Sequence, residues 1–181
     1  MRVAPVSDDL QQRVRRFIRD VPDYPKPGII FKDITPLLAA ADAFVEVTDA
    51  MAAPFASAEI THVVAIESRG FILGAPVAQR LGAGFVPVRK PGKLPHTTRR
   101  EEYELEYGTD ALEIHSDAVA SAERVLIVDD VLATGGTAAA TRRLVESLGA
   151  KVVGFSFLIT LSFLPGVSRL RGSRVERIVE Y

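Results

Sequence analysis

The stretch that decides the fold is Val125-Leu126-Ile127-Val128-Asp129-Asp130-Val131-Leu132-Ala133-Thr134-Gly135-Gly136-Thr137. Four apolar residues predict a buried strand over 125–128, which ends in two adjacent carboxylates. A short threonine- and glycine-rich loop then opens a predicted helix over 137–148, closed by Gly149. Glycines let a backbone approach a ligand closely, and free N–H groups at a helix start attract anions. The stretch therefore predicts an anion site at the carboxyl end of a buried strand.

The composition of this loop narrows the choice of ligand. No lysine follows the glycines, which excludes the P-loop NTPase pattern, and the Gly-x-Gly-x-x-Gly fingerprint of dinucleotide-binding proteins is missing. Asp129 and Asp130 suit the hydroxyl groups of a ribose, or a hydrated Mg²⁺, better than a phosphate. A phosphate on residues 133–137 beside a diol on the carboxylates describes a ribose 5-phosphate. The alternative is a plain strand end followed by a plain glycine turn.

Apolar strands and helices alternate on both sides of this stretch. Further strands are predicted over 62–66, 85–88 and 152–161, and a helix between the first two ends near Gly82. Continuous apolar strands alternating with helices indicate a parallel sheet covered on both faces. We therefore predict an α/β fold with an N-terminal appendage.

The N-terminal part is predicted to contain two helices and an ordered loop. Ser7 is a good N-cap for the first helix, and Asp42 is expected to cap the second, over residues 43–55. Between them, residues 21–36 hold four prolines and a glycine, which predicts a loop.

The composition excludes several classes of protein. The 181 residues suffice for one domain, and 48% apolar with 25% charged residues is ordinary for a soluble globular chain. A formal net charge of −1 gives no overall attraction to nucleic acid or to anionic membranes. Without cysteine there is no disulfide or thiol nucleophile, and the three histidines show no metal-ligand spacing. Since neither a secretory signal nor a membrane-length apolar stretch is found, we expect a cytoplasmic protein.

The stretch over residues 125–137 resembles the phosphoribosyl-pyrophosphate (PRPP) signature of the type I phosphoribosyltransferases. Three more blocks, in family order, resemble the adenine branch of that family: Asp23–Leu38, Val88–Pro95, and Tyr103–Gly108 leading into Leu112-Glu113-Ile114. The resemblance implies that the chain makes AMP and pyrophosphate from adenine and PRPP with Mg²⁺, as a homodimer in purine salvage. It also implies a parallel-sheet type I phosphoribosyltransferase fold. Residues 1–40 would form an N-terminal helix and a base-binding hood, and residues 41–181 a core with a flexible loop at about 89–108.

The resemblance also assigns the site residues. It places the 5-phosphate on Ala133, Thr134, Gly135, Gly136 and Thr137, and the ribose on Asp129 and Asp130. It places pyrophosphate on Ser68, Arg69, Gly70 and Lys90, and the base on Ile29, Ile30, Phe31 and Lys32. Glu106 matches the catalytic glutamate, and Tyr107 would help to close the lid. We add Arg89 and Lys93 to the pyrophosphate site because cations stabilise a leaving pyrophosphate. Metal is expected only as hydrated Mg²⁺ near Asp129 and Asp130.

Each assignment outside the phosphate loop has a simpler alternative. The Ser68-Arg69-Gly70 segment can be a turn, and Ile29 to Phe31 can be a buried strand. The basic loop over residues 89–100 can be solvated surface, and so can the acidic run of Glu101, Glu102, Glu104 and Glu106. A backbone carbonyl near Ile30 or Lys32 would favour adenine, whose exocyclic amine is a donor where oxopurines present an acceptor.

The chain also departs from the family pattern. Lys32 stands where many relatives have arginine, Thr160 replaces an expected glutamate, and residues 166–171 diverge from the usual Gly-Arg-Glu-Lys-Leu. Two alternative functions stay open: transfer to another base, such as xanthine or hypoxanthine and guanine, and a PRPP-sensing regulator without catalysis. The second normally carries a DNA-binding module, for which the N-terminus leaves little room.

Overall fold

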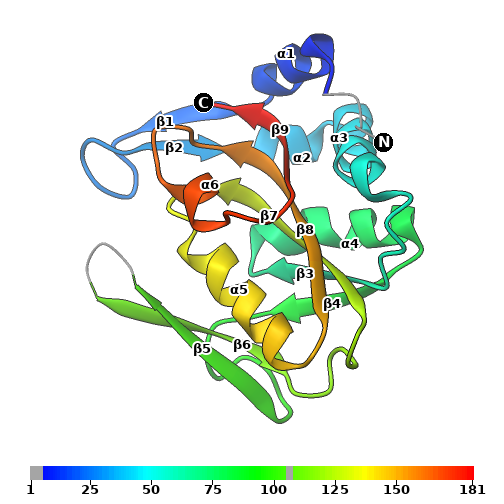
Figure 1. The fold of residues 1–181 in the computed structure, drawn as a ribbon. Coiled ribbons are helices and arrows are strands. Elements are labelled where there is room, and N and C mark those ends of the chain that lie inside the picture. The colour runs from blue at the N-terminus through cyan, green and yellow to red at the C-terminus, as the bar shows by residue number, and fades with distance from the viewer. Residues whose placement is uncertain (1–5, 105–107) are drawn as a thin grey trace.

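The core of the molecule is a parallel sheet with the strand order β4-β3-β7-β8-β9 (Figure 1). In that order the strands span Gly84–Val88, His62–Ile66, Arg124–Leu132, Lys151–Thr160 and Val175–Glu180. The computed structural model describes residues 6–104 and 108–181. The parallel sheet expected from the apolar runs is confirmed, and β9 extends it by a strand that the sequence pattern did not indicate.

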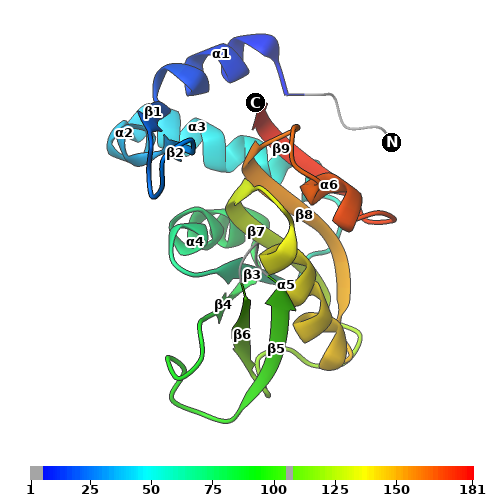
Figure 2. The same ribbon diagram turned by 90° about the vertical axis from the view of Figure 1, so that its left-hand side faces the viewer.

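Helices cover both faces of this sheet (Figure 2). One face packs against α3 (Ala41–Ala52) and α4 (Arg69–Leu81), and the other against α5 (Gly136–Ser147). Because side chains alternate along a strand, β7 serves both layers. Its residues Leu126 and Val128 lie in the α3–α4 core, whereas its residues Val125 and Ile127 lie in the α5 core.

The helix ends follow local chemistry, with one exception. Gly82 ends α4 in the left-handed region at φ +63°, as expected. The predicted cap at Asp42 is wrong, because α3 begins after Ala40 and Asp42 already lies in its first turn. The same helix stops at Ala52, and residues 53–55 continue as a 3₁₀ turn, η1 (Ala53–Phe55), that contains a proline.

The hood contains more regular structure than its prolines suggest. Its elements are α1 (Asp8–Arg16), β1 (Arg19–Pro22), β2 (Ile30–Asp33) and α2 (Thr35–Ala39). Ser7 caps α1 as expected, since its Oγ accepts from the Leu10 N–H at 3.3 Å. The predicted loop over residues 21–36 is wrong in part, because β1 and β2 pair antiparallel within it. The prolines lie at the end of a strand, in the turn and in the first turn of α2, where none interrupts the ladder.

A second hairpin begins within the segment predicted to be a flexible loop, at about 89–108. Residues 98–104 form β5 (Thr98–Glu104), which pairs antiparallel with β6 (Thr109–His115). Tyr103, Leu112 and Ile114 fasten this hairpin to the α5 core. The charged residues between them hid the strand pattern. A short helix, α6 (Gly166–Arg169), follows β8.

Candidate active site

A cavity of about 360 Å³ lies at the carboxyl edge of the sheet, between the hood and the ends of β3 and β7. It is lined by Ile29, Ile30, Phe31, Lys32, Ile66, Glu67, Ser68, Arg69, Asp129, Asp130, Val131, Ala133, Thr137 and Leu161. A more apolar cavity of about 670 Å³ shares Ile29, Ile30, Lys32, Ala133 and Leu161 with it and extends to Phe163 and Tyr181. The structure thus brings residues from the predicted base, pyrophosphate, ribose and phosphate segments into one site.

The two carboxylates lie inside β7, which continues to Leu132, and both are buried. The Asp130 N–H donates to Asp129 Oδ1 at 2.9 Å. Burial raises the pKa of Asp129 well above its usual range, and the neighbouring charge of Asp130 adds to the effect. Burial also raises the pKa of Asp130, although Arg69 opposes this. Hydroxyl donors or a hydrated cation would stabilise the charged form of such a pair.

Arg69 connects these carboxylates to the hood. Its Nε lies 2.7 Å from Asp130 Oδ2, and its guanidinium carbon lies 4.7 Å from the centre of the Phe31 ring. The next residue, Gly70, packs so closely that a Cβ there would lie 2.7 Å from Asp129 Oδ1. Only glycine lets α4 start this close to β7.

The phosphate loop, residues 133–137, is shaped by glycines and supported by α6. Gly135 begins α5 in the left-handed region at φ +80°, with no side-chain cap from any residue that the structure describes. A Cβ on Gly135 would lie 2.9 Å from the Gly166 carbonyl oxygen, and a Cβ on Gly166 would overlap the Ala133 carbonyl oxygen. The first N–H groups of α5 therefore remain available to an anion, and α6 packs against the loop that carries them.

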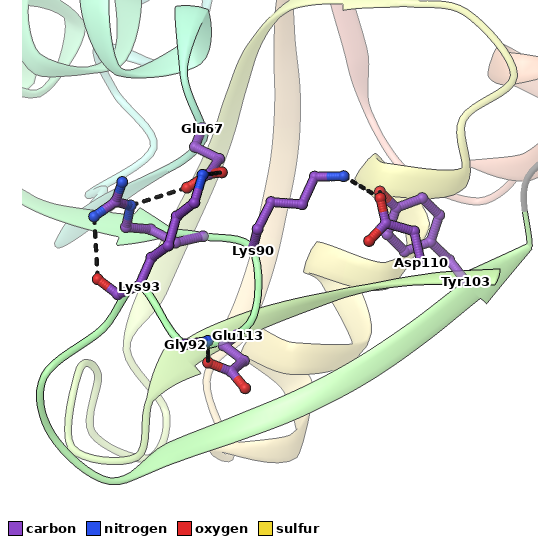
Figure 3. Close-up of polar contacts among 8 residues, drawn as sticks. Glu67, Lys90, Gly92, Lys93, Tyr103, Asp110 and Glu113 are labelled. Carbon is purple, nitrogen blue, oxygen red and sulfur yellow. Dashed lines mark hydrogen bonds and ion pairs between the residues drawn. The ribbon is translucent and has the colours of Figure 1, made fainter.

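Three of the four cations predicted to bind pyrophosphate lie in the loop after β4, and each is held by a carboxylate (Figure 3). Arg89 Nε donates to Glu67 at 2.9 Å, and Lys93 Nζ donates to the same carboxylate at 2.6 Å. Lys90 Nζ donates to Asp110 Oδ2, which also accepts from the Tyr103 hydroxyl at 3.1 Å. These side chains are thus both ion-paired and partly solvated, with 35%, 42% and 50% of the side chain exposed for Arg89, Lys90 and Lys93.

These pairs shift the titration of their members. Burial alone would raise the pKa of Glu67, but hydrogen bonds from Lys93 and Arg89 outweigh it and lower the pKa. The hydrogen bond between Lys90 and Asp110 lowers the pKa of the carboxyl and raises the pKa of the ammonium. Both shifts favour the charged pair that ties the loop after β4 to the hairpin of β5 and β6.

We expect the melting-temperature difference between the wild type and Asp110→Asn to depend on pH. A carboxyl with a lowered pKa stabilises the fold above its unfolded value, about 3.9, and loses this effect as pH falls through its folded value. A lysine with a raised pKa stabilises the fold below its unfolded value, about 10.4, and loses the effect above its folded value. The difference should therefore be constant between about pH 5 and pH 9 and shrink below about pH 4. Thermal denaturation across this range measures it, and a difference that does not shrink in acid would contradict the pairing.

The predicted base segment forms a strand, but not a buried one. Ile29 and Ile30 are 43% and 57% exposed and line both cavities. The buried-strand alternative is therefore wrong. Lys32, by contrast, keeps only 11% of its side chain exposed and donates to Asp20 Oδ1 at 2.7 Å.

Two predicted site residues, Glu106 and Tyr107, lie outside the described residues. Other residues of the site were not predicted. Leu161, which lines both cavities, was missed, although its place at the end of a predicted strand at the ligand edge could have indicated it. The partner Asp110 and the supporting Gly166 carry no sequence signal that would reveal such contacts.

Comparison with known proteins agrees with this geometry. A family model described as a phosphoribosyl transferase domain matches residues 34–169. The adenine phosphoribosyltransferase of Myxococcus xanthus is 60% identical over 164 residues, which cover 91% of this chain and 89% of the relative. The chain belongs to the adenine phosphoribosyltransferase family.

Solved adenine phosphoribosyltransferases share the fold. The enzyme from Rhodothermus marinus superposes with a TM-score of 0.93 at 52% identity, covering 97% of this chain and 100% of that one. The enzyme from Saccharomyces cerevisiae, solved with adenine and an imino-altritol bisphosphate, gives a TM-score of 0.90 at 39% identity and covers 95% and 99% of the two chains. The chain therefore has the type I phosphoribosyltransferase fold that the resemblance implied.

Within residues 6–104 and 108–181, no helix is long and apolar enough to cross a bilayer. In the same part of the chain, no three His, Asp or Glu side chains lie close enough together to hold a metal ion by themselves.

Proposed function

We propose that the site just described transfers the phosphoribosyl group of PRPP to adenine, giving AMP and pyrophosphate. The observation that carries this proposal is a single cavity that joins a phosphate loop, two buried carboxylates and the apolar strand β2. Each part suits one portion of the two substrates. Membership of the adenine phosphoribosyltransferase family supports the same reaction.

The PRPP half is bound in two places. The N–H groups of residues 133–137 and the hydroxyls of Thr134 and Thr137 receive the 5-phosphate. Asp129 and Asp130 accept hydrogen bonds from the ribose hydroxyls, which also relieve their mutual repulsion. The start of α4, with Ser68, Arg69 and Gly70, receives pyrophosphate.

The three cations of the loop after β4 also bind the pyrophosphate group. Arg89, Lys90 and Lys93 leave their carboxylates and turn to the diphosphate when PRPP binds, because a diphosphate carries more charge than the single carboxylates that hold them now. They then stabilise the charge that develops on the leaving group.

Mg²⁺ suits this site as a hydrated ion. Asp129 and Asp130 supply the carboxylate oxygens that it prefers, and a cation beside them would favour the charged forms that burial disfavours by raising the pKa of both. The two residues would hold the ion through its water ligands. When bound, it supplies positive charge that neutralises the diphosphate.

The base is bound by the hood. Ile29, Ile30 and Phe31 offer the apolar surface, Leu161 faces the same cavity, and backbone groups near Ile30 and Lys32 read the edge of the purine. As the ring nitrogen forms its bond to C1′ and the bond from C1′ to pyrophosphate breaks, Glu106 accepts the proton that the nitrogen loses. Tyr107 helps to close the lid.

The remaining parts of the proposal concern organisation. The hood (residues 1–40) serves the base, and the core (residues 41–181) serves PRPP. The enzyme acts as a homodimer in the cytoplasm, in purine salvage.

The test is turnover with each purine in turn. The pure protein with PRPP and Mg²⁺ should form nucleotide and pyrophosphate from adenine, and none from hypoxanthine, guanine or xanthine. Product from an oxopurine would keep the phosphate site and overturn the proposed reading of the base. PRPP binding without product from any base would identify a PRPP-sensing regulator instead.

A further inference from the structure

Tyr181 connects three parts of the molecule beside the base cavity. Its N–H donates to the Thr160 carbonyl at 2.9 Å, and its own carbonyl accepts from the Ser162 N–H and the Ser162 hydroxyl, both at 2.7 Å. These bonds hold it against the residues that flank Leu161, one wall of the cavity. Figures 1 and 2 both place the end of β9 next to α1 and the hood.

The Tyr181 ring meets two cations from the hood. Lys32 Nζ lies 3.8 Å from the ring centre, and the Arg15 guanidinium carbon lies 4.5 Å from it. Arg15 also donates to the Glu180 carbonyl, next to the ring. A cation over an aromatic face is attracted by the electron density of the ring, and more strongly when water is excluded. The Lys32 side chain, only 11% exposed, meets that condition.

Lys32 thereby transmits the position of Tyr181 to the base-binding strand. Across the hairpin it pairs with Asp20, both in backbone register and through its ammonium group at 2.7 Å. Its ammonium group is therefore held from two sides, by a carboxylate of β1 and by the Tyr181 ring. The side-chain role that the exchange of arginine for lysine had left open is a contact to this ring.

We propose that Tyr181 is a positioning residue for the purine base, which sets the spacing between β2 and Leu161 across the cavity. The inference rests on the proposed placement of adenine against β2. Loss of the ring makes the Lys32 end of β2 more mobile. Binding of the base then has to order the strand, which lowers the affinity for the base. PRPP is held by other elements, so its binding is unaffected.

The test compares Tyr181→Leu with Tyr181→Phe. The leucine variant keeps apolar volume but loses the aromatic face, so its KM for adenine should rise about tenfold, as expected for loss of a largely desolvated cation–π contact. Its kcat and its KM for PRPP should stay within about twofold of the wild type, a change worth little free energy. The phenylalanine variant keeps the face and should restore the adenine KM, since no hydrogen bond of the Tyr181 hydroxyl is found among the described residues.

Lys32→Met provides a second route to the same contact. It should raise the adenine KM as well, and in the double variant with Tyr181→Leu the two effects should add to less than their sum, because both changes remove the contact between Lys32 and the ring. Additive effects would overturn the proposed coupling. An unchanged adenine KM in Tyr181→Leu, or an equal rise in the KM for PRPP, would overturn the positioning role.

Ile30→Ala separates this inference from the function on which it rests. Ile30 lines the base cavity and is neither of the two cations that meet the Tyr181 ring, so its loss should raise the adenine KM directly. If Ile30→Ala has no effect on adenine, the proposed base site is wrong. If it weakens adenine while Tyr181→Leu does not, only the role of Tyr181 is wrong.

Discussion

Replacement of Glu106 by alanine should reduce kcat by about 10²- to 10⁴-fold, the usual contribution of a positioned general base. The purine must lose a proton as it attacks C1′, and without a carboxylate nearby that proton has to leave to water. PRPP should still bind, because the phosphate loop, Asp129 and Asp130 are untouched. Steady-state kinetics and an equilibrium titration with PRPP measure the two effects.

Two further variants make this result specific. Glu106→Gln keeps the size of the side chain and removes its basicity, so it should be about as slow as the alanine variant. Glu102→Gln is the matched control from the same acidic run, because among the described residues the Glu102 carboxylate pairs only with Arg100, and the side chain is 66% exposed. Its rate should equal that of the wild type. An unchanged rate in Glu106→Ala would remove this residue from the mechanism.

Gly166→Ala should weaken PRPP binding although Gly166 touches no part of the proposed substrate. The added methyl group would overlap the Ala133 carbonyl and approach the Leu132 side chain at 2.9 Å, so the phosphate loop has to move. Overpacking of this kind costs about 1–3 kcal/mol, which corresponds to a rise of about 5- to 150-fold in the KM for PRPP if the loop bears it. The KM for PRPP and the melting temperature together show whether the added methyl group displaces the phosphate loop or destabilises the fold.

The neighbouring Val167 supplies the control for this experiment. It lies on the same short helix, is 46% exposed and should tolerate alanine within about 0.5 kcal/mol. If Gly166→Ala lowers the melting temperature but leaves the KM for PRPP at its wild-type value, α6 does not support the loop as described.

The sequence predicted the parts of the fold that rest on continuous patterns. Residues 62–66 were placed as a strand because each apolar side chain in them is buried by the sheet and its covering helices. The hairpin of β5 and β6 was missed because its outward side chains are charged and its inward ones are few. Strand pairing there depends on contacts with α5, which are distant in sequence.

The site divides in the same way. Residues 133–137 are predicted to be a phosphate loop from their order and spacing, because such a loop is a local structure, and the fold places them at the start of α5. The partners of the basic loop could not be, because Glu67 and Asp110 meet Arg89 and Lys90 only after the chain has folded. Which carboxylate holds which cation is a property of the folded chain and not of any short segment.

The pairing of the basic loop has a consequence for selectivity. With Glu67 and Asp110 acting as internal counterions, the three cations present a weaker positive field to the surrounding solution than unpaired cations would. An anion is therefore not bound by charge alone, because it has to displace these carboxylates before it can pair with their cations. Under the proposed function, PRPP makes that exchange because its 5-phosphate and its ribose are held as well, so the site selects its substrate over other anions by requiring several contacts at once.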